Sequence, residues 1–348
     1  MSSRSESYSL NLSTIWEMDL WGRIRSSQNA ARFAFSASEM DHAAAQHSLA
    51  AQVVKGWLLL CEARIQISLA KELIQTAKTG KEQAMLRYQL GRGIASDVRL
   101  AETNLASATE QFNERLSNEA RFVRSLEIIL GRYPSGRIPH AETLPQMPGA
   151  IPIGVPSQIL TRRPDIAASV FRVRAADARI TEGKAGLLPQ LSLTNSAGTS
   201  SNQLKDLING NFLTWAIGSS ITQNVLLRDE QKERVQEREL VAQEETLNHR
   251  NIVMNAFLEV ENALNKSVYL SEQHKHQRAV ANGTSDLLVL AKNRFDVGTG
   301  SLRELVESQN RFIESRMRLT TINKLELENR VDLHLALGGG FSPKRTDK

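Results

Sequence analysis

The sequence predicts a mainly α-helical protein with a small antiparallel β part, built around long helical hairpins. Three observations predict this fold. Long stretches of helix-favouring residues contain almost no proline or glycine. Short segments that alternate apolar and polar residues precede them. The chain also matches itself when one copy is shifted by 207 residues.

The internal repeat covers about 120 residues without a gap. The matched pairs are Tyr8 with Trp215, Tyr88 with Phe295, Gly91 with Gly298, Gly93 with Gly300, and Leu130-Gly131 with Leu337-Gly338. We therefore expect a duplicated unit. Its first copy spans 1–131, a proline-rich connector follows at 132–158, the second copy spans 159–340, and a tail ends the chain at 341–348.

Within each copy a predicted strand leads into a long helix. In the first copy, period-two spacing of Leu10, Leu12 and Thr14 indicates a strand over 8–20. Helix-favouring composition then predicts a helix from about residue 22 to 90. Leu49, Val53, Leu60 and Ile67 lie four or seven residues apart, which is the spacing of a coiled-coil seam.

A glycine pair then interrupts the helix, at Gly91 and Gly93 in one copy and at Gly298 and Gly300 in the other. We interpret each pair as the turn of a helical hairpin, because helices commonly end in a left-handed residue. A nucleotide-binding loop is a poor alternative, since the third glycine and the βαβ unit are missing.

The second copy opens with a shorter predicted helix and two strands. Pro164 and Asp165 suit the first turn of a helix, and Gly183 and Gly186 are expected to end it. Strands are predicted over 189–199 and 213–226 and should pair with each other. The strand over 8–20 is expected to lack its partner.

Composition limits the class of protein. The net charge of +5 comes from intermixed charges and does not favour nucleic-acid binding. No run of about 18 apolar residues occurs, which excludes a transmembrane helix. The single cysteine, Cys61, excludes a disulfide framework and is expected to be a small buried or groove-facing residue. No signal peptide is visible at the start.

Four stretches resemble the TolC-like outer membrane factors, and in particular their NodT-type lipoprotein branch. They are WEMDLWGRIRS (16–26), LTRRPDIAAS (160–169), LLPQLSLTNSAG (187–198) and WAIGSSIT (215–222), and they stand in the family's order. The two Gly-x-Gly turns fall where that family places its periplasmic hairpin tips. The resemblance covers nearly the whole chain.

The resemblance implies a homotrimer in the outer membrane, in contact with lipid. Each subunit would contribute strands to one shared outer-membrane β-barrel and helical hairpins to a periplasmic α-barrel. The channel would export solutes or drugs received from a periplasmic adaptor protein and an inner-membrane pump. The hairpin tips, Gly91, Arg92, Gly93, Gly298, Thr299 and Gly300, would meet the adaptor.

Two departures from the family pattern stand out. NVLLRDEQ (224–231) replaces the family's proline- and glycine-rich corner between strand and helix. The repeat offset also implies that about 48 residues of the first copy should precede Met1. We therefore expect an N-terminal truncation, through gene annotation or gene decay, that removes one strand.

No catalytic, metal or cofactor constellation is predicted, so the protein is not expected to be an enzyme. His274 and His276 are two apart on a helix and are expected to be solvated. Transport through a pore needs no such chemistry. The alternatives are a soluble coiled-coil scaffold or adaptor, which leaves the amphipathic strands unexplained, and a decayed copy without function.

Three acids near the turns are the candidate aperture gate: Asp97, Glu304 and Glu307. As first-turn acids they would complement helix dipoles. By resemblance, Glu304 and Glu307 match acidic rings at the periplasmic aperture, where three copies would attract cations. Relatives pair the acid matching Asp97 with a tyrosine and an arginine. Here those positions hold Phe295 and Gly300, so the lock must differ, with Arg92 and Arg303 as nearby candidates.

Overall fold

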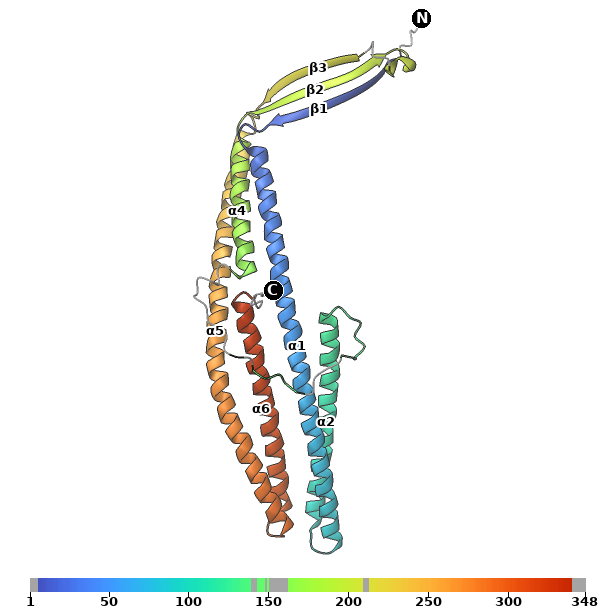
Figure 1. The fold of residues 1–348 in the computed structure, drawn as a ribbon, viewed down its shortest axis with the longest axis vertical. Coiled ribbons are helices and arrows are strands. Elements are labelled where there is room, and N and C mark those ends of the chain that lie inside the picture. The colour runs from blue at the N-terminus through green and yellow to red at the C-terminus, as the bar shows by residue number, and fades with distance from the viewer. Residues whose placement is uncertain (1–5, 139–142, 148, 150–161, 209–212, 340–348) are drawn as a thin grey trace, which may run out of the picture. The chain divides into compact units, whose positions relative to one another are not determined.

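The computed structural model describes residues 6–138, 143–147, 149, 162–208 and 213–339. Its elements are β1 (Tyr8–Met18), α1 (Arg23–Gln89), α2 (Ala95–Ile129), α4 (Pro164–Ala185), β2 (Gln190–Ser201), the short 3₁₀ helix η1 (Leu204–Ile208), β3 (Leu213–Thr222), α5 (Arg228–Asp296) and α6 (Leu302–Ala336). Helices dominate and the sheet is small and antiparallel (Figure 1), as the sequence predicts.

The chain folds into two compact units. The first contains residues 1–42 and 164–254, and the second contains 43–163 and 255–348. Helices α1 and α5 each contribute residues to both units. The boundaries of the sequence repeat remain an interpretation of the sequence. The predicted tail at 341–348, and residues 139–142, 148 and 150–158 of the connector predicted over 132–158, lie outside the described residues.

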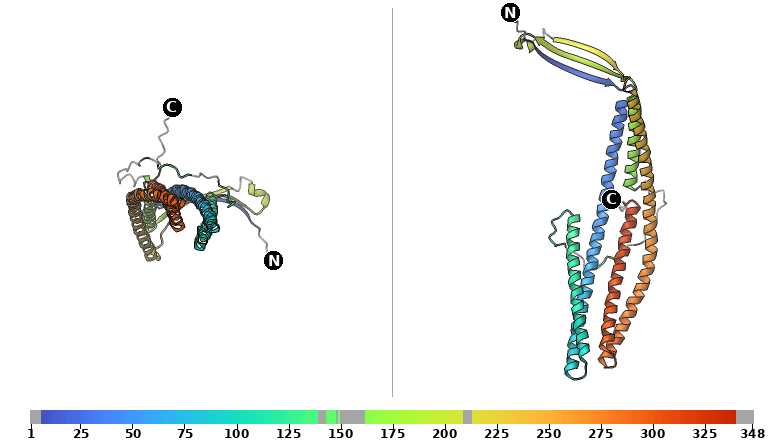
Figure 2. Two further views of the ribbon diagram at one scale, coloured as in Figure 1. Left: turned by 90° about the horizontal axis from the view of Figure 1, so that it is seen from below. Right: turned by 180° about the vertical axis from the view of Figure 1, so that it is seen from behind.

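The sheet of the first unit has three antiparallel strands in the order β1-β2-β3. Figures 1 and 2 show them side by side. β2 pairs with β3 as expected, but β1 also pairs with β2, from Tyr8 opposite Ser201 to Met18 opposite Leu191. The expectation that β1 lacks a partner was therefore wrong. A strand has two hydrogen-bonding edges, and β1 takes the edge of β2 that β3 leaves open.

The two faces of this sheet differ in chemistry. The register aligns Leu12, Ala197 and Trp215 across one face, and that face carries most of the large apolar side chains. It comprises Tyr8, Leu10, Leu12, Thr14, Trp16, Met18, Leu191, Leu193, Asn195, Ala197, Thr199, Ser201, Leu213, Trp215, Ile217, Ser219 and Ile221. The opposite face is mostly small and hydroxylated, with Ile15 as its large apolar member within the strands. Such alternation belongs to a sheet with two different environments.

A tight corner joins β1 to α1. Gly22 adopts a left-handed conformation (φ 76°), which glycine tolerates best. Both carboxylate oxygens of Asp19 accept backbone hydrogen bonds, from the N–H groups of Ile24 (3.0 Å) and Arg25 (2.9 Å), and so cap the helix. The Trp21 ring nitrogen donates to the Pro189 carbonyl (2.7 Å), which fixes the corner against the start of β2.

Helix α4 packs beside α1 and α5 within the first unit. It begins at Pro164, with Asp165 in its first turn, as predicted. Its end differs in one respect, because Gly183 lies inside the helix and only Gly186 follows it. A Cβ on Gly183 would lie 2.9 Å from the Arg238 guanidinium. Gly183 therefore allows α5 to approach closely.

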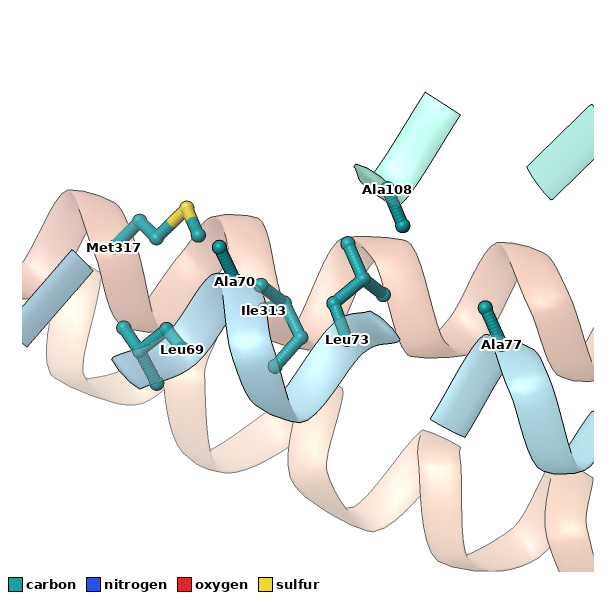
Figure 3. Packing of buried hydrophobic residues seen from close by; sticks show 7 residues of the cluster. All are labelled: Leu69, Ala70, Leu73, Ala77, Ala108, Ile313 and Met317. Carbon is teal, nitrogen blue, oxygen red and sulfur yellow. The ribbon is translucent and has the colours of Figure 1, made fainter. Parts of the chain in front are cut away.

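The core of the second unit lies where α1 packs against α2 and α6. Figure 3 shows Leu69, Ala70, Leu73 and Ala77 of α1 beside Ala108, Ile313 and Met317. Alanines recur in this cluster because small side chains let long helices approach. Cys61 is fully buried in α1, as the sequence suggested. Glu62 of α1 and Lys324 of α6 form a buried ion pair (3.5 Å) that fixes how the two helices are aligned.

Arg163, in the RRPDI stretch, stabilises the C-terminal end of α6 within the second unit. Its guanidinium donates to the Ala336 carbonyl (3.2 Å) and contacts the Glu259 carboxylate (2.6 Å). The carbonyls at a helix end have no partner within the helix, so an arginine there is stabilising. Within the described part of the chain, no helix is long and apolar enough to cross a lipid bilayer.

Candidate channel gate at the helical turns

Each glycine pair lies at a hairpin turn, as predicted. In the first turn Gly91 has φ 69°, its N–H bonds to the Tyr88 carbonyl (3.0 Å), and the Arg92 N–H bonds to the Arg87 carbonyl (2.8 Å). Gly298 (φ 82°) and Thr299 repeat these bonds to Phe295 and Arg294 in the second turn. Both turns are Schellman motifs, in which the left-handed residue closes a helix end.

The second glycine of each pair is required for a different reason. A Cβ on Gly93 would lie 3.1 Å from the Tyr88 backbone nitrogen, and one on Gly300 would lie 2.9 Å from the Phe295 backbone nitrogen. By contrast, among the described residues other than the chain neighbours, no atom lies within 4 Å of the Cβ position of Gly91 or Gly298. The first glycine of each pair thus provides the left-handed angle, and the second provides room for the preceding helix end.

The returning helices begin differently in the two hairpins. Ser301 caps α6, because its hydroxyl accepts the Glu304 N–H (3.2 Å). Ile94 occupies the same position before α2 and offers no side-chain cap. Asp97 lies in the first turn of α2, half-buried, and its carboxylate has no hydrogen-bond or ion-pair partner among the described residues.

The two predicted gate acids of the second hairpin each have a basic neighbour. The Glu304 carboxylate lies 3.0 Å from the Arg294 guanidinium of α5, and Glu307 lies 2.6 Å from Arg311, one turn further along α6. These four side chains line one open cavity of about 270 Å³ between α5 and α6. Sequence reasoning did not find the two arginines, although the spacing of Glu307 and Arg311 is that of a helical ion pair.

Arg87 connects the two hairpins beside their turns. Its guanidinium lies 3.8 Å from the centre of the Phe295 ring and donates to the Phe295 carbonyl (2.8 Å). Phe295 is buried among Ala84, Ala101 and Leu305. Arg92 and Arg303, which the sequence suggested as substitutes for the family's lock, are exposed and have no ion-pair partner among the described residues.

The described residues contain no group of three potential metal-ligating side chains. His276 is solvated, as expected, with 78% of its side chain exposed. His274 is less exposed, at 33% of its side chain, and its ring nitrogen lies 3.2 Å from the Glu326 carboxylate on α6. The side chains described around the helical turns are therefore charged and apolar groups without a metal-ligating cluster among the described residues.

Long helical hairpins that continue into an amphipathic antiparallel sheet define the class of TolC-like channel proteins. The chain belongs to the outer membrane efflux protein family, whose model matches residues 1–132 and 155–339. Its function is that of a channel subunit in an efflux system of the outer membrane. The family is one of transport channels and does not form a class of enzymes.

Relatives with recorded roles agree with this assignment. The toluene efflux pump outer membrane protein TtgF of Pseudomonas putida is 26% identical, with 96% of this chain and 70% of that protein covered. The cation efflux system protein CusC of Escherichia coli is 26% identical, with 98% and 74% covered. The solved structure of the Campylobacter jejuni CmeC outer membrane channel matches with a TM-score of 0.88 and 27% identity, with 96% and 72% covered.

Proposed function

We propose that three copies of the chain assemble into one duct that passes solutes from an adaptor and an inner-membrane pump across the outer membrane. The strands would pool into a shared outer-membrane barrel, and the helical hairpins would line a channel in the periplasm. The observation that carries this proposal is the sheet, whose apolar face is uncovered. Leu12, Trp215 and Ile221 are each more than 70% exposed, as lipid-facing residues would be in an isolated subunit.

The free edges of the sheet support an assembly. β1 and β3 are both edge strands, and each leaves a row of backbone N–H and C=O groups without partners in the sheet. Unpaired backbone groups are costly in lipid, where no water can satisfy them. Pairing with strands from other copies would remove that cost.

A row of apolar residues on α5 gives independent support for contact between copies. Leu240, Leu247 and Met254 lie seven residues apart, and each is about 60% exposed. Val280 and Leu287 form a second exposed pair seven residues apart further along α5, out of register with this row. Apolar residues at sevens form the seam between packed helices. In the proposed assembly a neighbouring copy covers this seam.

The helical turns are the proposed docking point for the adaptor and the proposed gate. Leu90, Ile94 and Val297 at the turns are exposed, although large and apolar, which suits a protein contact. Asp97, Glu304 and Glu307 would lie around the aperture. Because Glu304 and Glu307 are paired with arginines, their rings would carry less net charge than the acids alone.

The assembly is tested by the mass of the purified protein in detergent, measured by light scattering and by a crosslinking ladder. We expect both to give three chains. Replacing Leu247 and Met254 by glutamate should shift the mass to one chain, because the seam would carry charge. Glu244→Gln, an exposed change on the same helix, should leave it at three. A single-chain mass for the unaltered protein would contradict the proposal.

A further inference from the structure

An arginine-lined cavity of about 210 Å³ lies in the first unit, where four segments of the chain converge. The start of α1, the end of α4, the start of β2 and the first turns of α5 all contribute to it. Its lining residues are Arg23, Glu182, Gly183, Gly186, Gln190, Gln231, Arg234, Val235 and Arg238. Three arginines therefore face one open space with a single carboxylate among the lining residues.

The local ion pairs leave much of this hydrogen-bonding capacity unused. Glu17, outside the lining, holds Arg23 through Nε (3.0 Å) and Nη2 (2.6 Å), which leaves Nη1 without an acceptor among the described residues. Arg234 contacts Glu230 through Nη2 alone (2.5 Å). Each guanidinium carries five N–H donors, so both can bind a further oxyanion.

Arg238 is the most firmly positioned of the three arginines. Its Nη1 donates to the Arg179 carbonyl (2.7 Å), and Gly183 leaves room for its side chain against α4. The Glu182 carboxylate lies 3.4 Å away, at the long limit of a hydrogen bond. The one carboxylate of the lining is thus a weak competitor for an incoming anion.

The cavity adjoins the polar face of the sheet. Gln190, which lines it, and Glu17, which holds Arg23, both belong to the small, hydroxylated face, opposite Trp16 and Leu191. In the proposed channel this face borders the solute path, and the apolar face contacts lipid. An anion would therefore enter the cavity from the solute path.

We propose that this cavity is a binding site for the phosphate or carboxylate group of an anionic solute in transit. The site rests on the proposed function for its location and on the three arginines for its chemistry, because planar guanidinium groups bind oxyanions through paired N–H donors. It gives the duct an arginine-lined binding site on the solute path in addition to the acids at its turns.

The test is calorimetric titration of the purified protein, in a zwitterionic detergent, with inorganic phosphate at constant ionic strength. We expect saturable binding that Arg234→Gln weakens by about tenfold, as loss of a charge-assisted hydrogen bond does. Lys232→Gln is the matched control, because it removes the same charge from the same helix outside the cavity, and it should leave binding unchanged. Arg234 is 68% exposed, so its replacement should not disturb folding.

Equal phosphate affinity in Arg234→Gln and Lys232→Gln, or no saturable binding at all, would overturn the site. A second arm uses vesicles of phosphatidylglycerol or phosphatidylcholine to separate a lipid headgroup from a dissolved anion. Arg234-dependent binding to phosphatidylglycerol without phosphate binding would overturn the solute-path assignment. Conductance of the same samples in planar bilayers tests the duct separately: conductance without phosphate binding defeats this inference alone, and phosphate binding without conductance defeats the proposed function alone.

Discussion

The glycine pairs of the two turns combine a backbone requirement with a packing requirement. Gly91 and Gly298 supply left-handed angles, whereas Gly93 and Gly300 leave room for the preceding helix ends. The sequence alone located both turns, because the same pair of glycines recurs 207 residues apart within long helix-favouring stretches. It could not assign the two roles, since the close contact at Gly300 depends on the backbone path of the turn.

Gly300→Ala should therefore destabilise the second hairpin. Its Cβ would lie 2.9 Å from the Phe295 backbone nitrogen, and the forced shift should cost about 1–3 kcal/mol of unfolding free energy. Gly283→Ala in α5 is the control, because no atom lies within 4 Å of its Cβ position. That change should stabilise the helix by up to about 1 kcal/mol. Urea unfolding measures both, and equal effects would refute the packing role of Gly300.

The arginines beside the gate acids should moderate their field. Replacing Arg294 and Arg311 by glutamine would leave Glu304 and Glu307 unpaired, so we expect the channel's preference for cations to rise. Replacing the two glutamates by alanine should lower that preference. Reversal potentials across a planar bilayer with a salt gradient measure both changes. If neither pair of replacements alters the potential, the four residues lie away from the ion path.

At the scale of elements, the sequence predicted helices better than strand partners. Composition and the positions of the glycine pairs placed the long helices within a few residues of their observed ends. The partner of β1 was missed because a strand's apolar alternation shows which side chains share a face and does not show which strand lies beside it. Pairs such as Arg87 with Phe295, far apart in the sequence, depend on how the hairpins pack and left no local signal.

The stability of the first turn of α1 should depend on pH, because Asp19 caps this turn. Desolvation raises the pKa of this carboxyl, but hydrogen bonds from the backbone N–H groups of Arg25 and Ile24 bring the net pKa below its ordinary value of 3.8. A lowered folded-state pKa means that the cap stabilises fully above 3.8 and is lost as the pH falls through the lower folded value.

Hydrogen exchange of the Ile24 and Arg25 amides tests this dependence. Their protection should hold down to about pH 4, near the ordinary pKa of an aspartate, and fall in more acidic solution. Asp19→Asn retains a capping oxygen without the titration, so its protection should not change with pH over that range. Loss of protection at the same pH in both proteins would exclude Asp19 as the cause.

At the scale of the whole molecule, an added charge should be disruptive on the apolar face of the sheet and tolerated on its polar face. Ile217→Arg would place a charge on the apolar face. If that face lies at the bilayer midplane, the change should lower the stability of the membrane-inserted protein by about 2–4 kcal/mol. Gly218→Arg places the same charge one residue later on the polar face, where the Cβ position has no atom within 4 Å. Insertion of the protein into phospholipid vesicles should be lost only for Ile217→Arg. Equal tolerance of both changes would mean that the apolar face does not contact lipid.

The most direct test of the duct is the electrical conductance of the purified protein in a planar lipid bilayer. We expect discrete steps of current that appear when the three-chain species is added, because the proposed pore exists only in the assembly. Ile217→Arg protein at the same concentration should give none, and Gly218→Arg protein should give steps of its own. A three-chain species that inserts into the bilayer and carries no current would contradict the account.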